Sequence, residues 1–133
     1  MGAIGSSRLI DREMTVSTPA VPTIAVVIRE DPRKTHRPVE GLRIALGLST
    51  GSNPLTVVLL NNASLLLTED PEELVDGEIL EKHLPAIKDV GLSFVVQRGE
   101  SVRSGVDPSF QVREASDDEI STLIGQSNRV LVF

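Results

Sequence analysis

Short apolar runs rich in β-branched residues recur along this chain, and each is separated from the next by enough residues for one helix. The first three runs span 23–28, 55–60 and 92–96, and a fourth covers 129–133. Every side chain from 24 to 28 is apolar, a pattern typical of a strand that helices cover on both faces. We therefore predict an α/β protein, a three-layer α/β/α sandwich around a mostly parallel sheet of about five strands.

Two segments between these runs carry helix signals. Pro38 precedes apolar residues at helical spacing, which predicts a first helix that begins there and ends near Gly51. Residues 77–90 combine acidic side chains with an apolar stripe, which predicts a second, amphipathic helix. Because Pro85 lies inside that span and removes a backbone donor, two shorter helices are an equal alternative.

The last part of the chain predicts shorter elements. The polar connection 97–105 is expected to contain one or two helical turns, and Phe110 and Val112 mark a short fourth strand. Ser116 lies three residues before Glu119, which is the spacing of a capping box. This spacing predicts the start of a final helix before the last strand.

The length of 133 residues suits one domain, which we place at 23–133. Residues 1–22 carry glycine, serine and proline without a period, so we expect a flexible N-terminal tail. Met14 is an alternative native start, and in that case residues 1–13 are not part of the native chain.

The composition argues against several classes of function. The chain has no cysteine, so it supplies no disulfide, thiolate nucleophile or cysteine ligand for zinc. A net charge of −6 and only three aromatic residues argue against nucleic-acid binding, which needs basic and stacking surfaces. No apolar stretch approaches the roughly 20 residues of a membrane span, and no signal peptide is recognisable. We expect a cytoplasmic protein without a cofactor and without membrane or nucleic-acid partners.

No catalytic constellation is recognisable. His36 and His83 lie far apart and lack the spacing of a metal site, so we expect no metal. Serines 101 and 104 have no nearby histidine to activate them. A group of acidic residues could support acid–base chemistry, although a hydrophilic helix face is the commoner explanation: Glu72, Glu73, Asp76, Glu78 and Glu81. The sequence therefore leans toward a protein that is not an enzyme.

Basic side chains gather where ligands bind in such a sheet, beyond the carboxyl ends of the strands. One group follows the first predicted strand and another follows the third: Arg33, Lys34, His36, Arg37, Arg98 and Arg103. Together they predict an anion-binding site at this edge. The alternative is that long polar loops carry solvated charges, which is the commoner situation in soluble proteins.

An apolar patch at 63–67 falls outside the regular strand pattern and needs a burial partner. Its leucines, Leu65, Leu66 and Leu67, would invite association if they were left together in water. A subunit interface at these leucines is one hypothesis. The start of a helix that packs on the chain's own sheet is an equal alternative.

Two segments, 36–48 and 56–63, resemble the DsrE/DsrF-like family, which includes the small TusB, TusC and TusD sulfur-relay subunits. The resemblance covers approximately 23–133 and implies a flavodoxin-like or DsrE-like topology in a compact domain that assembles into dimers, trimers or hetero-hexamers. Sulfur-carrying members place a cysteine after the third strand, before a short helix. The matching stretch here is 97–106, and the cysteine position falls on or close to Gln97.

The resemblance implies a non-enzymatic assembly subunit linked to intracellular sulfur trafficking. A glutamine amide cannot form a persulfide, so the reactive cysteine would come from a partner. Expected partners are further copies of the chain or related subunits, with a cysteine-bearing sulfur carrier among the candidates. The alternative function is a small anion-binding or regulatory module that uses the basic cluster described above.

Overall fold

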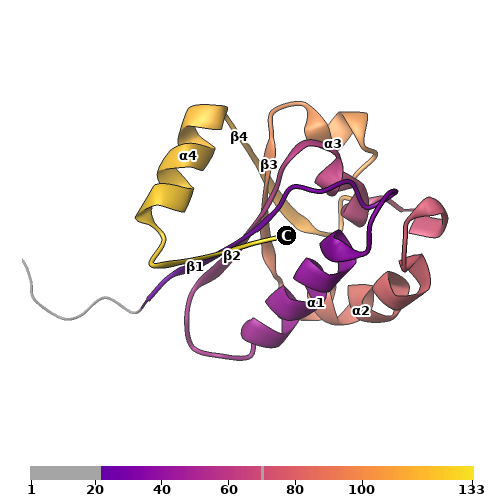
Figure 1. Cartoon of the computed structure of the whole chain (residues 1–133), viewed down its shortest axis with the longest axis horizontal. Coiled ribbons are helices and arrows are strands. Elements are labelled where there is room, and N and C mark those ends of the chain that lie inside the picture. Colours follow the sequence, from indigo (N-terminus) through magenta and orange to yellow (C-terminus); the bar gives the residue numbers. More distant parts are fainter. Residues whose placement is uncertain (1–21, 70) are drawn as a thin grey trace, which may run out of the picture.

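The computed structural model describes residues 22–69 and 71–133, which contain one five-stranded sheet with all strands parallel (Figure 1). Its strands, in the spatial order β4-β3-β2-β1-β5, have these bounds: β1 Ile24–Ile28, β2 Leu55–Leu59, β3 Ser93–Gln97, β4 Gln111–Ala115 and β5 Arg129–Val132. The expected tail, apart from Pro22, and the alternative start at Met14 lie outside the described residues.

Helices cover both faces of this sheet. Three longer helices, α1 (Arg37–Leu48), α2 (Gly77–Val90) and α4 (Asp117–Gln126), are joined by shorter ones: η1 (Asn61–Leu67), η2 (Pro71–Glu73) and α3 (Glu100–Arg103). Helices α1 and α2 lie on one face of the sheet, and α4 lies on the other (Figure 1). The expected three-layer α/β/α sandwich with a parallel sheet is confirmed.

Side chains of the central strands alternate between two cores. Val26 and Val57 are register partners on β1 and β2, and they pack in the core under α1 and α2. One residue further along each strand, Val27 and Val58 pack with Ile120 under α4. Because both faces are buried, the central strands read as continuous apolar runs without a polar alternation.

Helix α2 is one continuous helix that contains Pro85. The proline ring removes one backbone hydrogen bond, but Leu80 and Ile87 are buried on the opposite, core-facing side of the helix. Their burial favours an unbroken helix over two short pieces. Of the two alternatives for 77–90, the single helix is confirmed.

The capping box at the start of α4 is confirmed. The backbone N–H of Glu119 donates to Ser116 Oγ at 3.1 Å, and the Ser116 N–H donates to Glu119 Oε1 at 2.8 Å. Two otherwise unpaired donors are satisfied in this way. The box fixes the point at which the chain leaves β4 and turns onto the second face of the sheet.

The path of the chain determines the order of the strands in the sheet. Strands β1 to β4 follow one another across the sheet, and their connections lie on the face of α1 and α2. Helix α4 then carries the chain over the other face to the far edge, where β5 pairs with β1. The resulting order differs from the flavodoxin order 2-1-3-4-5.

The leucine patch lies in η1 and packs inside the chain's own core. Leu66 and Leu67 are fully buried, and Leu65 is partly buried against the same core. One subunit therefore accounts for their burial. This placement favours the alternative in which the patch packs on its own sheet over a subunit interface at these leucines.

No helix in the described residues is both long enough and apolar enough to cross a membrane.

Candidate functional site

A switch in the direction of the connections marks the candidate site. Strands β3 and β4 are neighbours, but the chain leaves β3 for α3, which packs against η1, and leaves β4 for α4 on the opposite face. In open α/β sheets such a switch point opens a crevice at the carboxyl ends of the strands. A cavity of about 370 Å³ lies at this point, lined by Asn61, Gln97, Arg98, Glu100, Ala115, Ser116 and Asp117.

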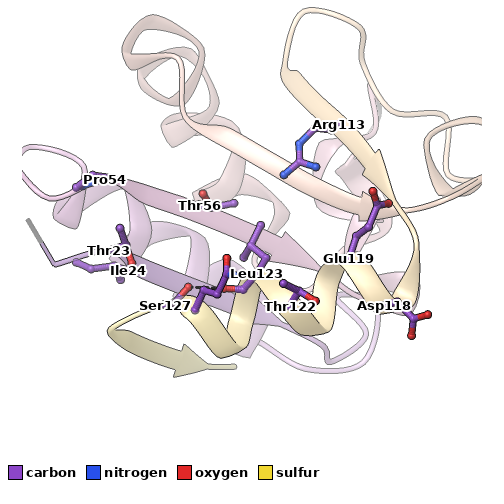
Figure 2. A pocket seen from close by; sticks show the side chains of 11 residues that line it. Thr23, Ile24, Pro54, Thr56, Arg113, Asp118, Glu119, Thr122, Leu123 and Ser127 are labelled. Carbon is purple, nitrogen blue, oxygen red and sulfur yellow. Dashed lines mark hydrogen bonds between the residues drawn. The ribbon is translucent and has the colours of Figure 1, made fainter. Parts of the chain in front are cut away.

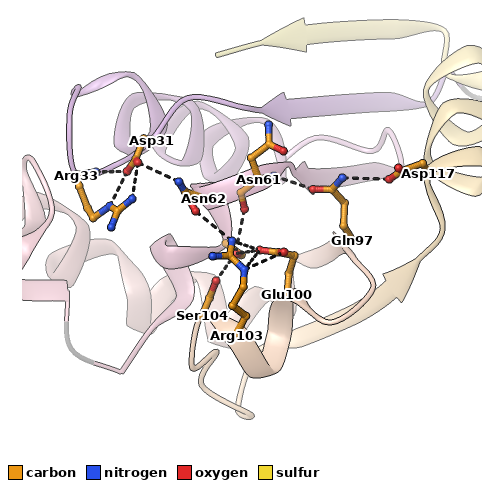
Figure 3. Close-up of polar contacts among 10 residues, drawn as sticks. Asp31, Arg33, Asn61, Asn62, Gln97, Glu100, Arg103, Ser104 and Asp117 are labelled. Carbon is orange, nitrogen blue, oxygen red and sulfur yellow. Dashed lines mark hydrogen bonds and ion pairs between the residues drawn. The ribbon is translucent and has the colours of Figure 1, made fainter.

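Gln97, at the end of β3, bridges two neighbouring elements in this cavity. Its Oε1 accepts the backbone N–H of Asn61 at 2.8 Å, and its Nε2 donates to Asp117 Oδ1 at 3.0 Å (Figure 3). Asn61 adopts a left-handed φ of 56°, which asparagine tolerates better than most residues. The Gln97 side chain therefore ties Asn61, the first residue of η1 after β2, to the start of α4.

A second polar network joins the loop after β1 to the short helices η1 and α3. Arg33 pairs with Asp31 at 2.8 Å, and Asn62 Nδ2 donates to the same carboxylate at 3.2 Å. The Asn62 amide oxygen accepts a hydrogen bond from Arg103 at 3.1 Å, and Arg103 also forms an ion pair with Glu100 (Figure 3). Asn62 thus links two of the expected basic residues: Arg103 by a direct hydrogen bond, and Arg33 through the carboxylate of Asp31.

These ion pairs hold two carboxylates in the charged form. The Arg33 guanidinium, helped by its backbone N–H and by Asn62, holds the pKa of Asp31 well below its usual value. Hydrogen bonds from Arg103 lower the pKa of Glu100 in the same way, with a smaller contribution from Ser64. Neither carboxyl group is therefore suited to donate a proton near neutral pH.

A pair of buried serine hydroxyls lies next to Glu100 of this network. Ser64 Oγ and Ser104 Oγ lie 2.6 Å apart, and both side chains are buried. Ser64 also lies 3.5 Å from Glu100 Oε1 and 3.3 Å from the carbonyl of Asn61. The pair joins η1 to the end of α3, so its role here is to position these two segments.

The remaining basic residues of the expected cluster lie apart from Asn62. Arg37 pairs with Glu30 at 3.6 Å and stacks over Phe133, and Arg98 pairs with Glu119 at 3.4 Å. Lys34 and His36 are exposed in the loop that connects β1 to α1. The structure therefore brings Arg33 and Arg103 together but directs Arg37 and Arg98 to other carboxylates.

A larger cavity of about 600 Å³ lies between α4 and the opposite, amino-terminal ends of the strands (Figure 2). Thr56, Leu123 and Arg113 are among the residues that line it. Its lining mixes hydroxyl and apolar groups and contains no histidine or cysteine. Among the described residues, no group of three or more histidine, aspartate or glutamate side chains is placed to hold a metal ion.

Several site residues were not singled out from the sequence, among them Asn62, Glu100 and Asp117. The asparagine directly follows a predicted strand, which is a usable signal for a site at the carboxyl edge. The other two are the first residues of α3 and α4 and have no distinguishing motif. Their roles depend on tertiary contacts, such as the one between Asn62 and Arg103, which lie 41 residues apart in the sequence.

The Asp31 ion pair predicts acid sensitivity. Because folding lowers the pKa of Asp31 from 3.8, the unfolded chain binds more protons below about pH 4, so this contribution to stability is complete above that pH and is lost as pH falls toward the folded-state pKa. Asp31→Asn should reduce the difference in unfolding free energy between pH 7 and pH 3 by about 1 kcal/mol. Urea denaturation at both pH values measures this difference. Arg33→Gln should act in the same direction, and an unchanged difference in both variants would contradict the assignment.

Comparison with known proteins supports the fold. No protein-family model matches the chain, and no curated protein matches it. The crystal structure of the ychN protein from E. coli is similar, with a TM-score of 0.62 at 17% sequence identity; the match covers 84% of this chain and 99% of that chain. At this identity the likeness establishes a shared α/β fold.

Proposed function

We propose that this chain is a non-enzymatic, DsrE/DsrF-like assembly subunit in intracellular sulfur trafficking, whose carrier cysteine belongs to a partner subunit. The observation that carries the proposal is the position of Gln97 and the hydrogen bonding of its side-chain amide. It occupies the switch-point cavity at the position that the resemblance assigns to the cysteine, and both ends of its amide are hydrogen-bonded within the chain.

The chemistry of the cavity supports a structural role. A glutamine amide is not a nucleophile, and nearby Glu100 is held in an ion pair with Arg103. The bridge from Asn61 through Gln97 to Asp117 links the loop after β2 to the start of α4 across the cavity. The fold shared with the ychN protein agrees with the domain that the resemblance implies.

Affinity capture from the source cell, followed by native mass spectrometry, tests this proposal. We expect a stable complex with a related subunit that carries a cysteine at the end of its third strand, and a labelled persulfide on that subunit but not on this chain. Recovery of this chain without any such subunit would contradict the proposal. Turnover of a sulfur compound by the purified chain alone would also contradict it.

The anion-binding alternative keeps one supporting observation: Arg103 donates directly to Asn62, and Arg33 is linked to the same asparagine through Asp31. Against it, both guanidinium groups are already paired with carboxylates. Calorimetric titration with phosphate, sulfate, thiosulfate and nucleotides separates the two functions. Saturable binding that is lost in Arg103→Gln would favour the anion-binding module.

A further inference from the structure

Two cavities on the α4 face of the sheet join into one groove. The cavity of about 600 Å³ beside α4 and a second one of about 420 Å³ over β3 and β4 share two lining residues, Thr56 and Arg113. Of the longer helices, only α4 covers this face, and the first residues of β3 and β4, Ser93 and Gln111, are exposed. We call the joined cavities the amino-end groove. Their volumes lie in the range of small-molecule sites.

Polar side chains form the floor of the amino-end groove. Thr56, Ser93 and Gln111 are register partners across β2, β3 and β4, so their side chains lie in one row on the same face of the sheet. The apolar residues two places further along β2 and β3 pack under α4, which is therefore the face of this row. Arg113 follows on β4 and points into the groove (Figure 2). A sheet face that is packed by helices would be apolar at these positions.

These polar groups are not used inside the chain. Within residues 22–69 and 71–133, no hydrogen bond involves the side chain of Thr56, Ser93 or Gln111. Arg113 forms no ion pair there, whereas the arginines at the other end of the strands each meet a carboxylate. In the switch-point cavity, by contrast, both ends of the Gln97 amide are hydrogen-bonded within the chain. The amino-end groove thus presents polar groups that a ligand can pair.

The charges around the groove favour an anion with a single charge. Asp118 and Glu119 also line it, but Asp118 points away from the cavity (Figure 2). Glu119 accepts a hydrogen bond in the capping box and pairs with Arg98 at 3.4 Å. The Arg113 guanidinium can bind a carboxylate through two parallel hydrogen bonds. A doubly charged phosphate would be repelled more strongly by the two acidic residues.

We propose that the amino-end groove binds a small amphipathic monocarboxylate. The carboxylate lies against Arg113 and beside the Thr56 hydroxyl, and the apolar body lies against Leu123 and Pro54. Burial of the apolar body supplies affinity, and the guanidinium fixes the orientation. The site lies at the opposite end of the strands from Gln97. The proposal therefore goes beyond the proposed function and does not depend on sulfur chemistry.

Calorimetric titration of the purified full chain with octanoate tests the proposal. We expect saturable binding, and 1-octanol, which keeps the apolar body but lacks the charge, should bind about tenfold more weakly or worse. Arg113→Gln should weaken octanoate binding by about tenfold and change octanol binding by less than about twofold. Arg129→Gln is the matched control, because Arg129 is an exposed arginine on β5 that lines neither cavity. It should leave octanoate binding unchanged.

Thr122→Trp tests the location of the site. Thr122 is exposed on α4 and lines the groove, so an indole there fills the cavity and should weaken both ligands by about tenfold. Circular dichroism and thermal melts verify that every variant is folded. A wild-type chain that binds no octanoate up to about 10 mM would overturn the proposal. Octanoate binding that persists in folded Arg113→Gln, or that disappears in Arg103→Gln instead, would overturn it as well.

Discussion

Leu66→Lys is expected to unfold the protein rather than to separate subunits. Leu66 has no exposed surface and packs in the core that η1 forms with the sheet. Truncation of such a leucine to alanine costs about 3–5 kcal/mol, and a lysine adds the cost of burying an ammonium group. Since a domain of this kind is stable by only about 5–15 kcal/mol, the variant should lose most of its stability.

Urea denaturation followed by circular dichroism measures this loss, and Val102→Lys is the matched control. Val102 is 88% exposed, so its substitution should change the free energy of unfolding by less than about 0.5 kcal/mol. Leu66→Ala extends the series with a smaller, measurable loss. A Leu66→Lys protein that unfolds at the wild-type urea concentration but has a smaller native mass would instead place a subunit interface at η1.

Gln97→Cys is expected to give this cysteine-free chain a reactive thiol in the switch-point cavity. Gln97 is half-buried and lines the cavity, so a cysteine there can be reached from solvent. With inorganic polysulfide, the thiolate attacks a terminal sulfur, a new S–S bond forms, and a polysulfide one sulfur shorter leaves. The loss of two side-chain hydrogen bonds should lower stability by about 1–3 kcal/mol.

Mass spectrometry of the folded variant detects this product as a gain of one sulfur atom. Val102→Cys is the control, because it places a lone thiol on the exposed surface of α3, outside the cavity. If the cavity keeps the carrier geometry, the persulfide at position 97 should form and survive longer than the one at position 102. Equal lifetimes, or no persulfide at 97, would contradict the correspondence between Gln97 and the carrier cysteine.

The strands and their parallel packing could be predicted because local sequence determines them. A residue such as Val58 is apolar for the same reason that its neighbours are: helices cover the sheet on both faces. The capping box at Ser116 is also local, since its two hydrogen bonds join residues three apart. The order of the strands is set by long crossovers, and the continuity of α2 through Pro85 is set by tertiary packing. Neither is encoded in a short window.

The candidate site was only partly predictable, because the sequence does not show how its charged side chains pair. The sequence shows Arg33 and Arg103 at the correct edge of the sheet, but it does not show which carboxylate each will meet. Asp31 and Glu100 lie close to these arginines in the sequence, yet Asn62, which joins the two pairs, comes from another loop. The four arginines of the cluster that reads as free positive charge are therefore each paired with a carboxylate.

The pairing of β5 with β1 carries a consequence for synthesis. Thr23, directly before β1, donates its backbone N–H to Asn128 Oδ1, and the two residues are 105 apart in the sequence. During translation, β1 to β4 emerge long before β5 can cover the side of β1. Until then β1 is the edge of the sheet, and its apolar residues lack the cover of β5 and α4. Nascent chains arrested before residue 129 should therefore be far more prone to aggregate than those released after it.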